Sequence, residues 1–339
     1  MRTTVTALSD RLRTEADAWE FMEELRWPNG PKCPACHGTD VYLVVPKNGI
    51  SRRTVSGSMS QRRTWNCRPC RRQFSATTGT MMHGTRVPLR TWVLCIFEAC
   101  ASKNGVSACE IERKYGLCSR TAWFLMHRIR EAMKSDALID SMRGTIVADE
   151  TYIGGDPKRM NKSARGDLYK LRMTPWVGDK FDRGTAKTPV LSLINAETGE
   201  VRSRVVAKVD GANLRKIISE QVDMAGSTLW TDEGSWYGPL GREFISHATV
   251  NHSADEYKDW ITGASTNKAE NFFSQLKRSI DGTYHHVSRE HLPRYLTEFD
   301  YRFSTHKLSD GERMARLVRR AEGRRLTYKR TRARVSTQH

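Results

Sequence analysis

Three acidic residues are placed where carboxylates could bind metal ions. Asp149 lies inside a run rich in Ile, Val, Ala, Tyr and Thr, where a charge must have a partner or a metal ion. Asp232 ends a short strand-like segment, and Glu270 lies early in a segment with helical periodicity. Three converging carboxylates would hold two Mg²⁺ or Mn²⁺ ions, which activate water and stabilise both oxygens of an in-line phosphoryl displacement. Because acids are common, the spacing alone also fits scattered structural carboxylates.

A basic residue follows the third acid at helical spacing. Lys277 comes seven residues after Glu270, and seven residues return an α-helix to within about 20° of its starting direction. The ammonium and the carboxylate would therefore point the same way, and Lys277 could clamp a phosphate beside the metal ions.

Four of the eight cysteines form two CxxC pairs, Cys33 with Cys36 and Cys67 with Cys70, thirty residues apart. Four thiolates at this spacing suit one tetrahedral zinc ion, so the sequence predicts a structural four-cysteine site. Two pairs of buried or redox thiols are the alternative. Eight cysteines are too few for a disulfide scaffold in a chain of this size, which favours a reducing cytoplasm. The other four are expected to be small buried hydrophobes: Cys95, Cys100, Cys109 and Cys118.

The charge balance indicates a polyanionic partner. The 339 residues include 56 Lys and Arg against 38 Asp and Glu, a formal net charge of +18, and such an excess is favourable beside nucleic acid. Residues 51–72 contain seven Arg and no acid. From this run we predict DNA contacts by Arg62, Arg63, Arg71 and Arg72, with a solvated charge run as the alternative. The longest apolar run, 92–97, is too short to span a bilayer, and charges interrupt the N-terminal segment, so neither membrane insertion nor export is expected.

Residues 88–134 are expected to be helical throughout. Helices are predicted at 89–101, 106–115 and 120–133, with a turn at Gly116 and a cap at Ser119. The last two have helix-turn-helix proportions, and the final helix carries two predicted DNA contacts, Arg120 and Arg128. A plain three-helix packing module is the alternative.

The remaining pattern predicts an α/β fold built around a mixed sheet. A first helix is expected within residues 1–30, and strands at 41–45 and 60–66. Further strands are predicted at 145–153, 190–195, 201–207 and 227–231, and helices at 212–224, 267–280 and 289–303. Residues 156–188 suggest a basic loop. Residues 311–339, with ten Lys and Arg against two acids, suggest a frayed helix that leads into a cationic arm.

The order and local sequence of these residues resemble a known family. Asp149, Asp232 and Glu270, with Lys277 seven residues later, resemble the DDE signature of bacterial insertion-sequence transposases. The surrounding sequences are more specific: ADETYIGG at 148–155, TDE at 231–233, STNKAENFFSQLKR at 265–278 and GTYHHVS at 282–288. With the upstream cysteine pairs they resemble the IS1595 (ISXO2-like) transposases over about residues 15–310.

The resemblance implies a ribonuclease-H-like catalytic domain and a DNA transposase. Such an enzyme binds the terminal inverted repeats of an insertion sequence, exposes 3′-OH ends by metal-dependent cleavage and transfers them into target DNA. It implies that Asp149, Asp232 and Glu270 hold two Mg²⁺ or Mn²⁺ ions and that Lys277 is the basic residue beside them, with Arg278 as a further DNA contact. The implied partners are double-stranded DNA, as element ends and as target, and further copies of the chain in a synaptic complex. The implied location is the bacterial cytoplasm, at the nucleoid.

The expected domains follow from the motifs and the resemblance together. They are an N-terminal helical segment (1–30), a four-cysteine zinc ribbon (31–80), a helix-turn-helix-like DNA-binding module (85–137), a ribonuclease-H-like DDE catalytic domain (143–305) and a basic C-terminal tail (306–339).

Two other functions stay open at this stage. A DNA-binding regulator derived from such an enzyme would be expected to have lost an acid of the triad. A stand-alone nuclease would leave the cysteine ribbon and the helical module unexplained. Near the triad, Glu150 should point away from the partners of Asp149 because strand side chains alternate. Asn267, His285 and His286 fit either a supporting role at the site or ordinary capping and loop polarity.

Overall fold

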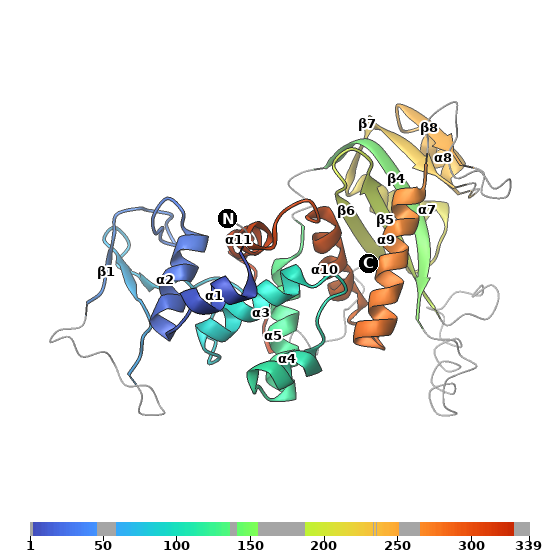
Figure 1. Cartoon of the computed structure of the whole chain (residues 1–339). Coiled ribbons are helices and arrows are strands. Elements are labelled where there is room, and N and C mark those ends of the chain that lie inside the picture. The colour runs from blue at the N-terminus through green and yellow to red at the C-terminus, as the bar shows by residue number, and fades with distance from the viewer. Residues whose placement is uncertain are drawn as a thin grey trace. The chain divides into compact units, whose positions relative to one another are not determined.

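The computed structural model describes residues 3–45, 59–135, 141–154, 187–232, 234, 236–250 and 265–328. The chain forms two compact units (Figure 1). The first combines Met1–Lys134 with His306–His339, and the second is Ser135–Thr305. Within the described residues, no helix is both long and apolar enough to cross a membrane. The basic loop predicted at 156–188 falls almost entirely outside the described residues, as do Arg52 and Arg53 and the cationic arm after residue 328.

The first unit begins with two helices, α1 (Val5–Arg11) and α2 (Glu15–Arg26), where the sequence predicts one. The break lies at Thr14, whose backbone is extended and whose hydroxyl accepts a hydrogen bond from the Asp17 N–H at 3.2 Å. Asp17 in turn accepts from the Thr14 N–H at 2.7 Å. This capping box starts a new helix and explains why the predicted single helix is wrong.

The cysteine module is a small antiparallel sheet in the order β1-β2-β3. Its strands are β1 (Val41–Leu43), β2 (Trp65–Cys67) and β3 (Gln73–Phe74), shorter than the predicted 41–45 and 60–66. Glu23 of α2 anchors the module, since its carboxylate accepts from Trp65 Nε1 at 2.8 Å and from Arg63 Nε at 2.9 Å. Arg26 adds a bond to the Ala76 carbonyl at 2.8 Å. The ribbon and α2 therefore form one structure.

Three helices follow close to their predicted positions: α3 (Leu89–Ala101), α4 (Ala108–Tyr115) and α5 (Ser119–Ala132). Gly116 ends α4 with a left-handed backbone, φ 61°, which glycine adopts without steric cost. The predicted cap is one residue too late, because Cys118 is the N-cap of α5. The Ser119 hydroxyl donates to Glu112 at 2.7 Å instead.

The C-terminal segment completes the first unit. Residues 306–328 differ from the predicted frayed helix, because α11 (Asp310–Arg320) is regular and packs on α2, α3 and α5. Its three apolar residues are buried on one side: Met314, Leu317 and Val318. Ser309 and Glu312 form a capping box at its start, and Arg313 donates to the Cys100 carbonyl at 2.9 Å. The second unit is thus inserted between two parts of the first.

The second unit is built on a mixed five-stranded sheet in the order β6-β5-β4-β7-β8. The strands are β4 (Met142–Ile153), β5 (Thr188–Asn195), β6 (Val201–Val205), β7 (Val222–Thr231) and β8 (Ser246–Thr249). The first three pair antiparallel, whereas β4, β7 and β8 run parallel. The predicted α/β class with a mixed sheet is confirmed. The predicted helix at 212–224 was too long, because α7 (Gly211–Ser219) ends before β7 begins.

Helices cover both faces of this sheet (Figure 1). On one face α7 and α8 (Tyr237–Gly241) bury Ile146, Ala148 and Leu229. On the other, α9 (Asn267–Ser279) and α10 (Leu292–Ser304) bury Val147 and Ile194, and the π-helical turn η4 (Ile280–Tyr284) connects them. Consecutive residues of β4 therefore face different helices, as the alternation of a strand requires.

Candidate functional site

The first two acids of the predicted triad lie next to the point where the pairing of two adjacent parallel strands ends. The last pair in register between β4 and β7 is Val147 with Trp230. Asp149 and Asp232 each come two residues later, Asp149 inside β4 and Asp232 directly after β7, so they continue this register side by side where the parallel pairing ends. Neighbouring strands lie about 4.8 Å apart, which brings the two side chains into the same region. The sheet thus joins residues that are distant in sequence.

The third acid lies on the same side of the sheet. Val147 packs into the core under α9, beside Phe272 and Phe273, and Asp149 follows it by two residues and so shares its face. Glu270 is in the first turn of α9 and is exposed. A helix N-terminus favours a carboxylate through its partial positive charge. The three acids therefore come from the middle of β4, the residue after β7 and the first turn of α9, on a common side.

The electrostatics of Asp149 link all three carboxylates. Burial, the charge of Asp232 and, more weakly, those of Glu150 and Glu270 raise the pKa of Asp149 to about 7, against the lowering effect of the Glu150 N–H. That N–H donates to Asp149 Oδ1 at 2.7 Å. Each neighbouring acid disfavours the ionised form of Asp149 because like charges repel. A divalent cation would reverse this repulsion, and oxygen donors are the ligands that Mg²⁺ and Mn²⁺ prefer. The residues present therefore fit a divalent metal site.

The spacing of the triad is more open than that of a single closed metal site. In the part of the chain that the structure describes, the four cysteines are the one group of three or more His, Cys, Asp or Glu residues gathered closely enough to hold a single ion, with donor atoms within 4.8 Å of one another. The three carboxylates are therefore not gathered around one point. Ions shared between pairs of them, with water or phosphate as further ligands, suit this arrangement better.

Glu150 points to the other face of the sheet, as the alternation predicts. Its Oε1 accepts a hydrogen bond from the Tyr237 hydroxyl at 2.6 Å, and Tyr237 belongs to the core under α7 and α8. Burial raises the pKa of Glu150 to about 7, against the hydrogen bond from Tyr237, and the charge of Asp232 adds to the rise. Tyr237 is not predicted from the sequence, because nothing in its local sequence distinguishes it from an ordinary core residue.

Two basic residues near the end of α9 are exposed. Lys277 and Arg278 lie in the last turn of the helix, and Arg278 donates to the Ser274 hydroxyl at 3.0 Å. Both are accessible to a polyanion.

The four predicted zinc ligands come together in the first unit. The Sγ atoms of Cys33 and Cys70 are 3.5 Å apart, as are those of Cys36 and Cys67. Each CxxC pair ends in a tight turn, since His37 donates to the Cys33 carbonyl and Arg71 to the Cys67 carbonyl, both at 2.8 Å. The residue that follows each pair has a positive φ, 59° for His37 and 56° for Arg71. This paired geometry aims four sulfurs at one point, as tetrahedral zinc requires.

One thiol of this cluster, that of Cys33, is shifted toward the thiolate form, whereas, against the lowering effect of the Cys70 N–H, burial and hydrogen bonds among the cysteines raise the pKa of Cys67 to about 12. Burial raises the pKa of Cys33, but hydrogen bonds from the Ala35 and Cys36 N–H groups and from the Cys70 thiol outweigh it and lower the pKa to about 7. A thiolate is the form that binds metal.

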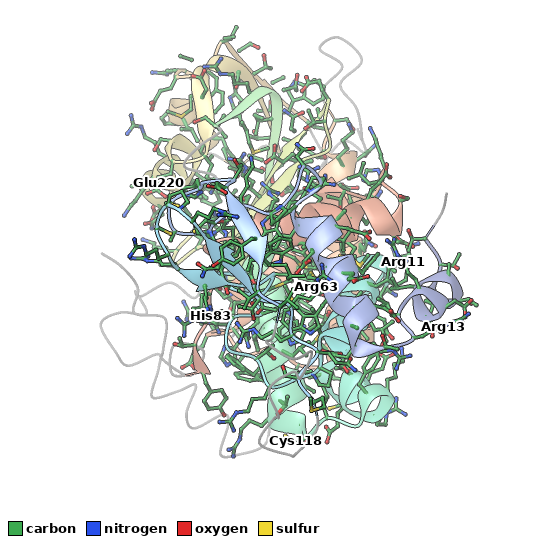
Figure 2. All side chains as sticks on the ribbon, turned by 90° about the vertical axis from the view of Figure 1, so that its left-hand side faces the viewer. Arg11, Arg13, Arg63, His83, Cys118 and Glu220 are labelled. Atoms are coloured by element: carbon green, nitrogen blue, oxygen red, sulfur yellow. The ribbon has the colours of Figure 1, made fainter. Side chains whose placement is uncertain are left out.

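The arginines of the first unit that are predicted to contact DNA differ in their exposure to solvent. Arg71, Arg72 and Arg120 are exposed. Arg62 is exposed too, and donates to the Ser75 hydroxyl at 3.0 Å. Arg63 pairs with Glu20 at 2.7 Å and with Glu23 at 2.9 Å, so it lies against α2 (Figure 2).

Arg128 is placed differently from its prediction. It is 6% exposed, donates to the His83 carbonyl at 2.8 Å and lies over the rings of Trp92 and Phe124. A guanidinium held in this way is not presented to a phosphate. Its burial therefore argues against the predicted DNA contact and assigns Arg128 to packing of the helical unit.

Comparison with known proteins gives matches to both units. Residues 141–304 match the ISXO2-like transposase domain, and residues 13–73 match the transposase zinc-ribbon domain. Over 295 residues the chain is 24% identical to an uncharacterized protein in transposable element ISH50 of Halobacterium salinarum. This alignment covers 85% of the chain and 90% of the relative.

Proposed function

The chain belongs to the ISXO2-like transposases with an N-terminal transposase zinc ribbon, and on this basis we propose how it acts. It binds the terminal inverted repeats of an insertion sequence, cleaves a strand at each end to expose a 3′-OH, and joins those ends to target DNA. Asp149, Asp232 and Glu270 hold two divalent cations, Mg²⁺ or Mn²⁺, at the carboxyl edge of the sheet. The four cysteines hold one structural Zn²⁺.

The adjacency of Asp149 and Asp232 supports this proposal most strongly. The last pair in parallel register, Val147 with Trp230, precedes each of them by two residues, and Glu270 lies in the first turn of the helix that covers the face of Val147, which supports a shared site. The strand order also supports a ribonuclease-H-like core, since three antiparallel strands are followed by two parallel ones, with Asp149 within β4 and Asp232 directly after β7.

The chemistry divides between the ions and the chain. When bound, two cations would supply an activated water for cleavage and would stabilise the attacking and leaving oxygens of each displacement. Asp149 and Asp232 hold and orient the cations from the rigid sheet, and Glu270 closes the site from α9. Lys277 and Arg278 bind phosphates of the DNA strand that enters beside Glu270, because both are exposed on the same helix.

The first unit supplies DNA recognition. The ribbon presents Arg62, Arg71 and Arg72, and the start of α5 presents Arg120. These residues contact phosphates, and α4 and α5 act as a helix-turn-helix-like module. Two element ends need two active sites, so the working form is a homo-oligomer in a synaptic complex, and we place it in the cytoplasm at the nucleoid.

A plasmid that carries the gene with its flanking DNA tests the proposal. The full-length protein with Mg²⁺ should nick this plasmid at the borders of the element, leave 3′-OH ends and join them to a second plasmid. Asp149→Asn should bind the same DNA but give no nick, whereas Glu220→Gln, an exposed acid in the same unit (Figure 2), should retain full activity. Retained Mg²⁺-dependent cleavage by Asp149→Asn would refute the assignment. Specific binding without cleavage by the unaltered protein would favour the regulator instead.

A further inference from the structure

Hydrogen bonds connect the two aspartates through the opposite face of the sheet. Asp149 Oδ1 accepts from the Glu150 N–H at 2.7 Å, and Glu150 Oε1 accepts from the Tyr237 hydroxyl at 2.6 Å. The Tyr237 N–H donates to the Gly234 carbonyl at 3.1 Å, and the Gly234 N–H donates to Asp232 Oδ1 at 3.1 Å. Both ends of this path are carboxylate oxygens of the proposed metal site.

Tyr237 is the residue of this hydrogen-bonded path that core packing holds most rigidly. Its side chain is fully buried, at 0% exposure, and packs in the core with Ile146, Ala148 and Leu240. A ring enclosed in this way has little freedom to move its hydroxyl away from Glu150. Burial and the charge of Glu150 raise the pKa of Tyr237 well above its ordinary value, so the hydroxyl keeps the proton that it donates.

The position of Asp232 needs such a support. The ladder between β7 and β8 ends with Thr231 and Thr249, so Asp232 lies just outside the regular sheet. Two ionised carboxylates side by side repel each other when no cation lies between them. The carboxylates of Asp149 and Asp232 can keep a defined separation if both are linked by hydrogen bonds to one rigid residue.

We propose that Tyr237 is a positioning residue that sets the separation of Asp149 and Asp232 by bonding to Glu150 with its hydroxyl and to Gly234 with its backbone. This inference rests on the proposed function, because it assigns the two aspartates to a shared metal site. Tyr237 itself touches neither DNA nor the cations. Its hydroxyl acts by holding Glu150, and with it the Glu150 N–H that orients Asp149.

Tyr237→Phe removes the hydroxyl and keeps the buried ring. The matched control is Tyr284→Phe in the same unit, because the Tyr284 hydroxyl donates to a buried glutamate, Glu298, at 2.7 Å in a different part of the core. Supporting residues around metal ligands typically change metal affinity by about 10–100-fold when they are lost. We therefore expect Tyr237→Phe to weaken Mn²⁺ binding by about tenfold, and Tyr284→Phe to leave it unchanged.

Calorimetric titration of the full-length, zinc-loaded protein with Mn²⁺, without DNA, measures this effect directly. Cleavage of the plasmid substrate gives a second measure, since the Mg²⁺ concentration for half-maximal rate should rise in Tyr237→Phe and the rate at saturating Mg²⁺ should recover. Recovery also shows that the variant is folded. If the Tyr237 hydroxyl only stabilised the fold, both variants would melt at a lower temperature, and neither the Mn²⁺ affinity nor the Mg²⁺ concentration for half-maximal rate would change.

Two results would overturn the inference: equal Mn²⁺ affinity in Tyr237→Phe and the unaltered protein, or an equal loss in Tyr284→Phe. Failure of the proposed function is a separate outcome. An unaltered protein that binds Mn²⁺ through Asp149 and Asp232 but cuts no DNA would refute the transposition reaction, while the Mn²⁺ titrations would still decide the role of Tyr237.

Discussion

Replacing Asp149 by Asn should stabilise the metal-free protein while it abolishes catalysis. The cost of ionising Asp149 in the folded state appears in its pKa, which burial and the charge of Asp232 raise from 3.8 to about 7. A rise of about three units corresponds to roughly 4 kcal/mol of destabilisation above pH 7. Asn has no charge to bury and can still accept the Glu150 N–H, so we expect a gain of about 2–4 kcal/mol for the second unit.

The assay is thermal unfolding in a chelator that removes Mg²⁺ but spares the zinc site, at pH 5 to 8. At roughly 2–4 °C per kcal/mol for a domain of this size, the transition of the second unit should rise by about 4–16 °C at pH 8. The folded pKa lies above the unfolded one, so the unaltered protein loses stability as pH rises from about 4 to about 7, and the variant does not lose this part. The difference should therefore grow from pH 5 to pH 8.

Added Mg²⁺ should reverse the order. The unaltered protein gains stability by binding the cation, whereas Asp149→Asn has lost a ligand and gains less. Glu220→Gln serves as the control, because Glu220 is exposed and its replacement should leave the transition within about 0.5 kcal/mol. A variant that melts at or below the temperature of the unaltered protein at pH 8 without Mg²⁺ would contradict this account of a strained, metal-free carboxylate site.

Three further outcomes follow from the two units. Cys67→Ser should release the zinc and unfold the ribbon, so metal analysis should find less than one zinc per chain and binding of the element ends should be lost; full zinc content would contradict this. Leu317→Ala should destabilise the first unit by about 2–5 kcal/mol, measured by chemical denaturation, because Leu317 is fully buried. Arg316→Ala, on the exposed side of α11, should leave the free energy of unfolding almost unchanged. Equal denaturation midpoints for the two variants would show that α11 is not part of that unit. Burial raises the pKa of Asp300 to about 7, so the folded protein loses stability as the pH rises from about 4 to about 7. Asp300→Asn should reduce this loss, measured as the melting temperature at each pH. An unchanged dependence of the melting temperature on pH would refute burial of Asp300 as a cause.

The candidate site could be predicted where residue types carry their own chemistry. Paired CxxC motifs name four zinc ligands without any knowledge of the fold. Asp149 could be singled out because a charge inside an apolar strand needs a reason. Sequence alone does not show that Asp149 and Asp232 are neighbours, because that depends on parallel pairing of β4 and β7, with β5, β6 and α7 between them in the chain.

The parts that were missed have no distinct local signal. Tyr237 is an ordinary aromatic residue until β4 brings Glu150 to its hydroxyl. Arg128 looks like a surface cation because helical spacing does not show which side the Trp92 ring covers. The strand β8 (Ser246–Thr249) pairs on one side only within the described sheet and has no apolar run to mark it.

The helices also differ in how well local sequence predicts them. The range of α3 was predicted in full, since Pro88 opens it and a continuous apolar pattern fills it. The α11 helix offered only Met314, Leu317 and Val318 among many cations, and its docking on α2, α3 and α5 is decided by long-range packing that local sequence does not display. The charge pattern therefore indicated only a frayed helix leading into an arm, whereas tertiary burial makes this segment a regular helix.

The most direct test of the central claim is to bind Fe²⁺ in place of Mg²⁺ and generate hydroxyl radicals at the ion with ascorbate and peroxide. Radicals formed at a bound ion cut the nearest backbone. If two strands and a helix hold the cations together, cuts should appear around residues 149, 232 and 270 in the same sample, and all three should vanish in Asp149→Asn. Cuts at only one of these positions, or cuts that persist in the variant, would show that the three acids do not form one metal site.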